Sequence, residues 1–337
     1  MLTQPPPLGL QGVWLSQLAR RHGLELRGPD GPVRHLARIK ASRADLSDVL
    51  TYITAAHYVD GFVASGHEAA IIERRFWRDD LPADRAWLVC DQAADEVFFS
   101  AHIDLVEAGR VQFLQASRGS DTAIHPAAVV MDHVQIGDGV RIDAGAVLYP
   151  NTVIADGVHV KANATIGGEG FEAKVIGGRR RIIPHTGGVF VDTGAAIGSS
   201  TCVDRGLFGT MTAIGACAQV DNLVHVAHNV VIGPDSGVVA CAEISGSCVL
   251  GRGVWFGPRA CCNHELTFGD YAYVGTGSVV TRSVPAHALV FGAPAKQGGW
   301  ACICRNRISD FNDQASCGKC GTRLIRDAAG NVRIAEP

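Results

Sequence analysis

An apolar residue stands at every sixth position over two long stretches of this sequence, and no other feature constrains the fold as strongly. A period of six matches neither the 3.6-residue repeat of an α-helix nor the alternation of a plain strand. It is typical of a parallel β-helix, in which three hexads form one coil and successive coils stack at roughly 4.8 Å. The apolar positions are Ile124, Val130, Ile136, Ile142, Leu148, Ile154, Val160 and Ile166, and then Ile214, Val220, Val226, Ile232, Val238, Ile244, Leu250, Phe256, Cys262, Phe268, Val274 and Val280.

The rhythm divides the chain into three predicted parts. Residues 1–120 lack it. There, VWLSQLARRHGLEL predicts a short amphipathic helix ending at Gly23, and the apolar runs VLTYITA, GFVAS, AAIIE and AWLVC predict a small α/β domain. Residues 121–291 form the predicted β-helix, and residues 292–337 form a Cys-rich tail.

Composition limits the partners and the cellular compartment that we expect for this protein. The 40 glycines agree with tight corners that recur every six residues. A net charge of −3 gives no reason to expect nucleic acid or an anionic membrane as a partner. We find no stretch apolar enough to span a membrane and no signal peptide at the start, so we expect a cytoplasmic protein. Its eleven cysteines are then expected to be thiols or metal ligands.

The hexad rhythm breaks twice. The first break, from Gly167 to Gly188, contains the exposed-looking Phe171 and the basic run Arg179–Arg181. We expect its outer part to leave the coil as a loop, and the basic cluster favours a functional loop over a tolerated insertion. Hexad positions return at Val191, Ile197 and Val203, and the second break, DRGLFGTMTA, shifts the phase by one residue before Ile214.

The tail carries two close pairs of cysteines. Cys302 and Cys304 form the first pair, and Cys317 and Cys320, in CGKCG, form the second. Four thiolates in two pairs predict a tetrahedral zinc site like that of a zinc ribbon. Because cysteines would fill all four positions, such a zinc ion would be structural. The alternative is four unconnected surface thiols.

Histidines are the most informative polar residues of the predicted β-helix. His228 and His264 each follow an inward position, Val226 or Cys262, by two residues. They should therefore occupy one column two coils apart, roughly 10 Å from each other, with Gly246 between them. A neutral imidazole in such a groove is a suitable general base for an amine or hydroxyl nucleophile. The alternative is that both are idle surface histidines.

At these residues the chain resembles the UDP-3-O-acylglucosamine N-acyltransferases of lipid A biosynthesis. The best match is DNLVHVAHNVVIG, residues 221–233. The resemblance implies a left-handed parallel β-helix, His228 as catalytic base, Asp221 as the acidic residue that orients it, and His264 as a second histidine of the groove. Gly246 matches the glycine whose backbone N–H is the proposed oxyanion donor. Asp204-Arg205-Gly206 matches the family as well.

Other parts of the resemblance concern the substrate. Gly170-Phe171 is similar to the family's D-G-F-G loop, from which Glu169 and Glu172 depart. The resemblance implies substrate contacts from Phe171 and Asn229. In the N-terminal domain the family stacks two aromatic residues on uracil. Tyr52 and Tyr58 stand at those places, although the family's Asn-Pro between them is replaced here by two alanines. Ordinary half-buried strand tyrosines are the alternative.

The resemblance implies acyl transfer from a thioester to the amine of a UDP-linked amino sugar, with no catalytic cofactor and with sites between the subunits of a homotrimer. The tail departs from the family, whose terminal helices help to dock acyl carrier protein. A G-x-P-A-K turn followed by cysteine pairs is similar instead to sugar N-acetyltransferases of surface-polysaccharide pathways, which generally use acetyl coenzyme A. The sequence therefore leaves the donor open between acyl carrier protein and coenzyme A.

Three alternatives to this function exist, and the second lacks the histidine set that it requires. The first is an acetyl-CoA-dependent sugar N-acetyltransferase of polysaccharide or secondary-metabolite synthesis. The second is a β-helical zinc hydratase of the carbonic anhydrase type. It needs a third histidine five residues beyond His264, where this chain has Gly269. The third is a non-catalytic scaffold that binds nucleotide sugars.

Overall fold

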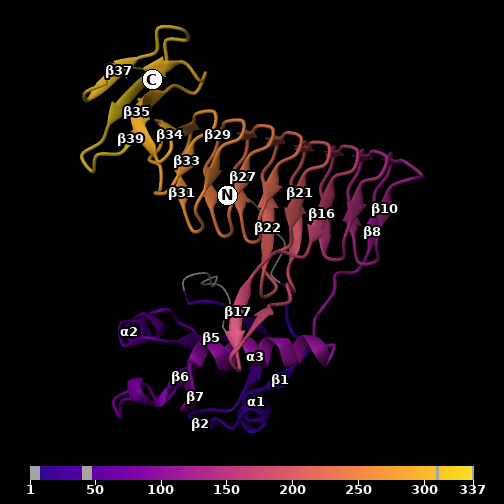
Figure 1. The fold of residues 1–337 in the computed structure, drawn as a ribbon, viewed down its shortest axis with the longest axis vertical. Helices are drawn as coiled ribbons and strands as arrows, with labels where there is room; N and C mark the ends of the chain where they lie inside the picture. The colour runs from indigo at the N-terminus through magenta and orange to yellow at the C-terminus, as the bar shows by residue number, and fades with distance from the viewer. Residues whose placement is uncertain (1–7, 40–47, 309–310, 336–337) are drawn as a thin grey trace.

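The computed structural model describes residues 8–39, 48–308 and 311–335 and has three parts (Figure 1). A small α/β domain lies to one side of a long β-helix, and a small antiparallel sheet lies beyond its last coil. Within the described residues, no helix has the length and apolar character that crossing a membrane requires.

The N-terminal domain is built on a five-stranded sheet with the order β2-β7-β6-β5-β4, in which only β2 is antiparallel to its neighbour. Helix α3 packs on β5 and β6, where Phe98 and Phe99 are fully buried. The elements are β1 (Val13–Trp14), α1 (Leu15–His22), β2 (Glu25–Arg27), β3 (Pro32–Val33), β4 (His35–Leu36), β5 (Val49–Ile53), α2 (His57–Ala64), β6 (Ala69–Glu73), η1 (Arg74–Phe76), β7 (Ala86–Cys90) and α3 (Ala94–Glu107).

The first helix is present where the apolar pattern predicts it. Leu15 and Leu18 face the core, and Gly23, with φ of 66°, ends the helix in the left-handed conformation that glycine tolerates. Trp14 precedes the helix and is 48% exposed, so it does not share the buried face.

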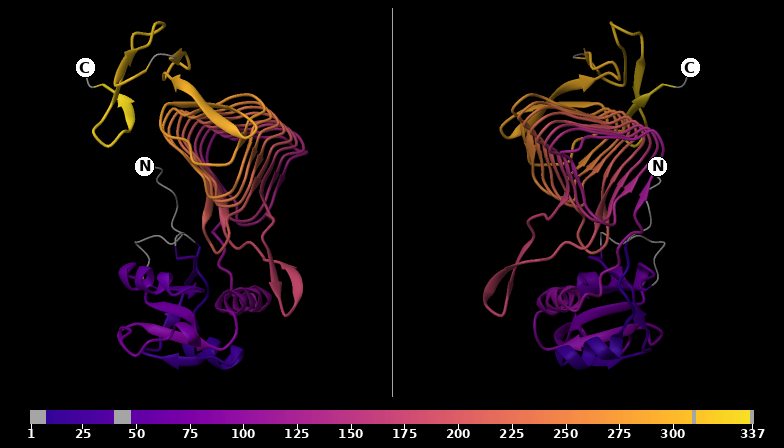
Figure 2. Two further views of the ribbon diagram at one scale, coloured as in Figure 1. Left: turned by 60° about the vertical axis from the view of Figure 1, so that its left-hand side comes forward. Right: turned by 90° about the vertical axis from the view of Figure 1, so that its right-hand side faces the viewer.

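Three parallel sheets form the sides of the β-helix, and Figure 2 shows its triangular outline. One sheet contains β8 (Ser117–Arg118), β11 (Gln135–Ile136), β14 (Thr152–Ile154), β19 (Gly188–Val191), β22 (Met211–Ile214), β25 (Val231–Ile232), β28 (Val249–Leu250) and β31 (Thr267–Phe268). The second contains β9 (Ala123–Ile124), β12 (Arg141–Ile142), β15 (His159–Val160), β20 (Ala196–Ile197), β23 (Gln219–Val220), β26 (Gly237–Val238), β29 (Trp255–Phe256), β32 (Tyr273–Val274) and β34 (Ala288–Gly292). The third contains β10 (Val129–Val130), β13 (Val147–Leu148), β16 (Thr165–Gly168), β21 (Cys202–Asp204), β24 (His225–Val226), β27 (Glu243–Ile244), β30 (Cys261–Cys262) and β33 (Val279–Val280).

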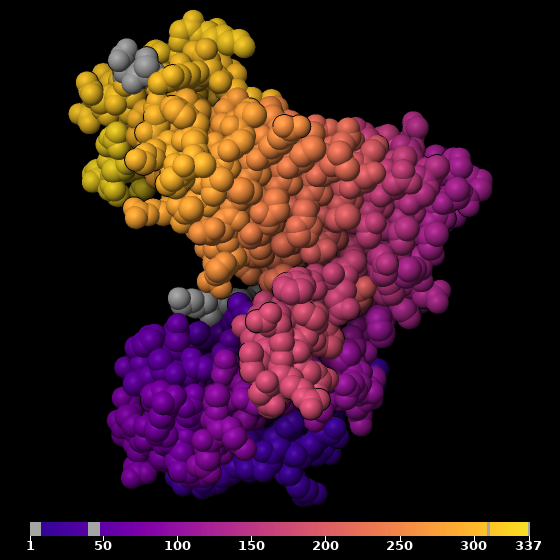
Figure 3. All heavy atoms as spheres, in the orientation of Figure 1, coloured from indigo at the N-terminus to yellow at the C-terminus, as the bar shows by residue number. Residues whose placement is uncertain are grey.

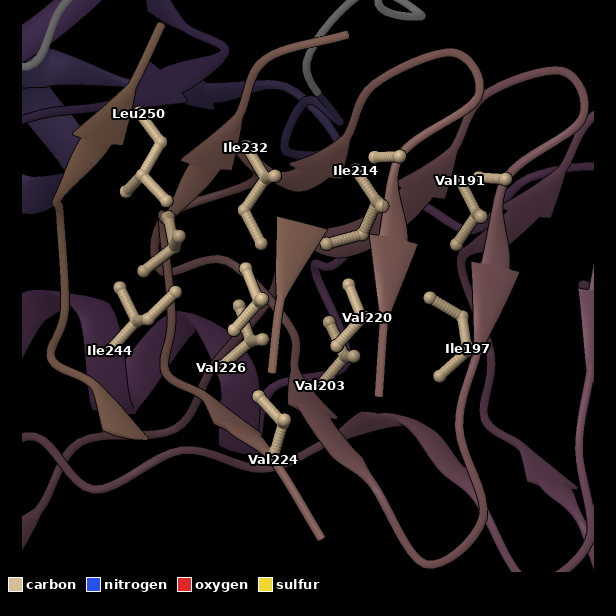
Figure 4. Close-up of a cluster of buried hydrophobic side chains, with 14 of the residues drawn as sticks. Val191, Ile197, Val203, Ile214, Val220, Val224, Val226, Ile232, Ile244 and Leu250 are labelled. Atoms are coloured by element: carbon tan, nitrogen blue, oxygen red, sulfur yellow. The ribbon is translucent and has the colours of Figure 1, made fainter. Parts of the chain in front are cut away.

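From Ile136 onward the hexad positions point into this triangle, as predicted, whereas Ile124 in the first coil is only partly buried and Val130 is 37% exposed. Val129 pairs with Val147, and Val147 with Thr165, so stacked residues are three hexads apart. Every inward position from Ile136 to Val280 is at most 5% exposed, and Figure 4 shows part of this core. Burial of each such Val, Ile or Leu side chain contributes roughly 1.5–3 kcal/mol. The parallel strands begin at Ser117, slightly ahead of the expected boundary.

Both breaks in the rhythm contact the N-terminal domain. The outer part of the first break is a hairpin of β17 (Ala173–Ile176) and β18 (Arg179–Ile182) that contacts α3 (Figure 1). In the space-filling view of Figure 3, the atoms of this segment lie against those of the N-terminal domain. The second break contributes Leu207 and Phe208 to the core around α3, and the ring of Phe208 lies 5.2 Å from that of Phe98. Both predicted departures from the coil therefore help to hold the two domains together.

The tail continues from the last coil. β34 pairs with β35 (Ala295–Ala301), and β35 pairs with β36 (Arg307–Ile308), both antiparallel. A separate antiparallel sheet follows, made of β37 (Gln314–Ser316), β38 (Arg323–Arg326) and β39 (Val332–Ile334).

Candidate functional site

The structure confirms the predicted column of groove residues. Val226 pairs with Ile244, and Ile244 pairs with Cys262. His228, Gly246 and His264, each two residues further on, therefore stand at the same corner of successive coils. Backbone hydrogen bonds join these corners, since the N–H of Ser247 donates to the carbonyl of His228 at 2.9 Å.

Gly246 leaves room for the imidazole of His228. A Cβ atom at position 246 would lie 2.8 Å from both Cε1 and Nε2 of His228, closer than any side chain tolerates. Within the described residues, the backbone N–H of Gly246 donates to no acceptor. The imidazole of His228 therefore packs directly against the α-carbon of Gly246.

Asn229 holds the imidazole of His228. Its Oδ1 accepts the backbone N–H of Leu207 at 3.0 Å and lies 2.9 Å from Nδ1 of His228. Since a backbone N–H can only donate, the amide oxygen must face Leu207, and Nδ1 of His228 must carry the proton. Nε2 is then the unprotonated nitrogen. With φ of 61°, Asn229 adopts a left-handed turn, which asparagine tolerates well.

Asp221 does not contact His228 within the described chain, in contrast to its expected orienting role. It stands at the preceding corner, after β23, where its carboxylate accepts the backbone N–H groups of Asn222 at 2.8 Å and Ala240 at 3.2 Å. Asp221 precedes His228 by seven residues, one more than a hexad, so the two side chains stand at different corners of the coil. Asn229 supplies the contact that was expected from Asp221.

The first break places a carboxylate beside the imidazole. Oε2 of Glu172 lies 3.7 Å from Nε2 of His228, and Oε1 accepts from Arg38 at 2.7 Å and Lys174 at 2.9 Å. Burial acts to raise the pKa of Glu172, but Arg38, Lys174 and His228 together lower it below the ordinary value. The carboxylate is therefore ionised at neutral pH.

A second buried imidazole supports the groove. The ring centroids of His185 and His228 are 5.1 Å apart. Nδ1–H of His185 donates to the carbonyl of Ile183 at 3.0 Å, and burial, followed by the nearby His228, lowers the pKa of His185 to about 4. The backbone N–H of His185 donates to Glu169 at 3.0 Å, so Glu169 anchors the loop. Within the described residues, Nε2 of His185 has no hydrogen-bond partner.

Arg205, in the Asp204-Arg205-Gly206 segment that resembles the family, holds the start of the loop that begins at Gly167. Its Nε donates to the carbonyl of Gly167 at 2.7 Å, and its guanidinium lies over Tyr149 at 5.6 Å. Asp204 lies 3.0 Å from Nε2 of His225, and this contact raises the pKa of His225. These contacts stabilise the groove wall.

The other predicted site residues surround the groove. Tyr52 packs on Phe98, with ring centroids 4.7 Å apart, and burial raises the pKa of its hydroxyl. Tyr58 lies against His57 and is partly exposed. Phe171 is 78% exposed and is available to a ligand. A small cleft between the domains reaches His228 and is lined by Leu36, Ala37, Arg38, Leu207, Phe208, Thr210, His228, Asn229 and Ser247.

The four tail cysteines converge. The sulfur atoms of Cys302, Cys304, Cys317 and Cys320 all lie within 4.8 Å of one another. Four sulfurs at about 2.3 Å from a tetrahedral zinc ion would be roughly 3.8 Å apart. The observed distances of 3.4 Å between Cys302 and Cys320 and 3.6 Å between Cys304 and Cys317 fit that arrangement.

Sequence reasoning did not identify Glu172, Arg38, Lys174 or His185 as members of the site. Glu172 and Lys174 lie in the insertion, and Arg38 lies in the other domain, so the hexad spacing could not place them. The available signal was the departure of Glu169 and Glu172 from the D-G-F-G loop.

Comparison with known proteins supports the repeat and the resemblance. Residues 133–168 match the bacterial transferase hexapeptide (six repeats) family. The chain is 44% identical over 135 residues to UDP-3-O-acylglucosamine N-acyltransferase from Caulobacter sp. (strain K31), covering 40% of this chain and 39% of that protein. It is 32% identical over 189 residues to the protein of the same name from Anaeromyxobacter sp. (strain K), covering 54% of this chain and 53% of that protein. The chain thus matches only part of the length of these relatives.

Solved structures show the same fold. UDP-N-acetylglucosamine acyltransferase from Campylobacter jejuni aligns with a TM-score of 0.51 and 23% identity, covering 55% of this chain and 71% of that chain. The Arabidopsis UDP-N-acetylglucosamine acyltransferase aligns with a TM-score of 0.50 and 19% identity, covering 55% of this chain and 64% of that chain. The chain therefore has the left-handed parallel β-helix of the hexapeptide type that the sequence indicated.

Proposed function

We propose that this protein transfers an acyl group from a thioester to the amine of a UDP-linked amino sugar, with His228 as general base. The observation that carries this proposal is the tautomer that Asn229 imposes on His228. It leaves Nε2 unprotonated and next to Gly246, whose backbone N–H donates to no acceptor within the described residues. A base next to an oxyanion donor is the arrangement that acyl transfer needs.

The proposed reaction uses these groups in order. The amine nitrogen attacks the carbonyl carbon of the thioester, and Nε2 of His228 accepts the proton that the nitrogen loses. The C=O π electrons move to oxygen, where the N–H of Gly246, with His264 further along the groove, stabilises the negative charge. When the tetrahedral intermediate collapses, the C–S bond breaks and the thiolate leaves with the electron pair. The imidazolium of His228 returns the proton to sulfur.

The acceptor is proposed from several features together. The relatives named above are N-acyltransferases of UDP-3-O-acylglucosamine, as their names state. Tyr52 and Tyr58 are partly exposed on the N-terminal domain, where an aromatic face could stack on uracil. The exposed Phe171 and the cleft beside Asn229 would border the sugar. By analogy with the family, the sites would lie between the subunits of a homotrimer.

The donor and the tail form a separate part of the proposal. The core residues favour acyl carrier protein, whereas the cysteine-rich tail favours a coenzyme A thioester such as acetyl-CoA. The tail cysteines fit zinc, and a zinc ion bound by four thiolates would stabilise the fold of the tail and leave no open coordination position for water.

Product analysis tests this function. UDP-glucosamine and other UDP-amino sugars would be offered with a mixture of acetyl-CoA, longer acyl-CoA and acyl carrier protein thioesters, and the products would be identified by mass spectrometry. We expect an N-acylated UDP sugar, and the mass added reveals the donor. If no donor yields an acylated sugar while a UDP sugar still binds, the protein is a nucleotide-sugar-binding scaffold.

A further inference from the structure

Glu172 places a negative charge on the reactive side of His228. Its Oε2 lies 3.7 Å from Nε2, the nitrogen that acts as base, rather than beside Nδ1. Its Oε1 is already occupied by Arg38 and Lys174, at 2.7 and 2.9 Å. The lone pairs of Oε2 therefore remain available toward the place where the nucleophile must lie.

The surroundings hold this carboxylate ionised and in position. Three groups adjoin it, namely Arg38 after β4, Lys174 on β17 and His228 after β24, and, in addition to burial, its charge acts to raise the pKa of Tyr52 on β5. The Glu172 side chain is only 13% exposed, so water screens its charge poorly.

One further charge lies behind this cluster. Glu265 is 3.5 Å from Nη1 of Arg38, and its side chain is 56% exposed. It adds negative charge on the far side of Arg38 and leaves the approach to Oε2 of Glu172 unaltered.

An amino-sugar acceptor arrives largely as an ammonium ion. Amines next to electron-withdrawing groups, such as the α-amino group of a peptide, have pKa values of about 7.7–8.0. A nitrogen placed roughly 2.9 Å from both Oε2 of Glu172 and Nε2 of His228 would satisfy ordinary hydrogen-bond distances to each. One N–H bond of the ammonium would then point at the carboxylate and another at the base.

We propose that Glu172 binds the ammonium group of the acceptor and thereby makes the site selective for amino sugars over hydroxyl acceptors. This inference rests on the proposed N-acyl transfer. Glu172 remains a carboxylate throughout. The extra proton of the ammonium passes to Nε2 of His228 and then to water, which leaves a neutral amine and a neutral imidazole. The neutral amine then attacks the thioester. His228 accepts the second proton that the amine nitrogen loses and transfers it to the leaving sulfur.

Binding measurements test this role without turnover. Calorimetry would compare UDP-glucosamine with UDP-glucose, which carries a hydroxyl where the amine stands, for wild type, Glu172→Gln and Glu107→Gln. Glu107→Gln is a matched control, because Glu107 pairs with Arg181 of the same hairpin at 3.6 Å but lies outside the groove. Hydrogen bonds to charged groups contribute about 1.5–3 kcal/mol, so we expect wild type and the control to prefer the amino sugar by roughly 10- to 100-fold. Glu172→Gln should bind both sugars alike.

The pH dependence separates ammonium binding from a merely structural role. Raising the pH from 7 to 9 removes the charge of the amine, so the preference of the wild type should shrink toward one. This measurement needs no variant, so a preference that stays the same from pH 7 to 9 would refute ammonium binding even if Glu172→Gln does not fold. Equal binding of both sugars by wild type at pH 7, or an unchanged preference in Glu172→Gln, would overturn this inference and leave the proposed function standing. Failure of wild type to bind either sugar would overturn both.

Discussion

Replacing Gly246 by alanine tests whether the position of His228 governs the reaction. The new Cβ atom would lie 2.8 Å from Cε1 and Nε2 of the imidazole. Non-bonded carbon contacts are optimal at about 3.5–4.0 Å, so the ring must move by roughly 0.7 Å or more. Because a misplacement of about 1 Å can cost about 10²-fold in rate, we expect kcat/KM to fall by approximately that factor.

A matched variant separates misplacement from loss of stability. Gly275→Ala also introduces a clash in the β-helix, since its Cβ would lie 2.9 Å from Cβ of Phe291, but Gly275 follows β32, outside the groove column. Overpacking costs about 1–3 kcal/mol, so both variants should lose a similar amount of unfolding free energy in urea titrations. Only Gly246→Ala should lose acyl transfer, measured as thiol released from the thioester. Full activity in Gly246→Ala, or an equal loss in Gly275→Ala, would refute this reasoning.

Three further predictions address the orienting amide, the metal and the buried imidazole. Asn229→Ala should lower kcat/KM by about 10- to 100-fold, because His228 loses the acceptor that selects its tautomer; wild-type kinetics would show that the tautomer is set elsewhere. Purified protein should contain one zinc per chain by elemental analysis, and Cys302→Ser/Cys304→Ser should contain none, with acyl transfer retained; zinc-free wild type would contradict the metal site. The folded-state pKa of His185, about 4, lies below its ordinary 6.5, so the unfolded chain binds more protons in this window and stability falls as the pH is lowered through it. Between pH 7 and 5, wild type should lose about 2 kcal/mol more unfolding free energy than His185→Gln; parallel losses would refute this assignment.

The fold was predictable because its core repeats. The inward positions from Ile136 to Val280 belong to one cluster of buried apolar residues, where a polar side chain would need a partner to replace its contacts with water. Because of this requirement, the regular spacing of apolar residues from Ile136 to Val280 predicts the fold. The same spacing correctly placed His228, Gly246 and His264 in one column.

The site was less predictable where it left the repeat. The hexad spacing itself separates Asp221 from His228, and the expectation of a contact came from the resemblance alone. Glu172 reaches Nε2 of His228 from an insertion whose hairpin is held by α3 of the other domain. Such a contact depends on how two domains pack, which short-range patterns in a sequence do not encode.

The most direct test of the central claim is the rate of thiol release from the thioester, measured with and without the amino sugar, in wild type and His228→Ala. If His228 is the general base, release by wild type depends on the amino sugar. Removing the imidazole should then slow release by about 10²- to 10⁴-fold, with the far-UV circular dichroism unchanged. A folded His228→Ala variant that releases thiol at the wild-type rate would contradict the account.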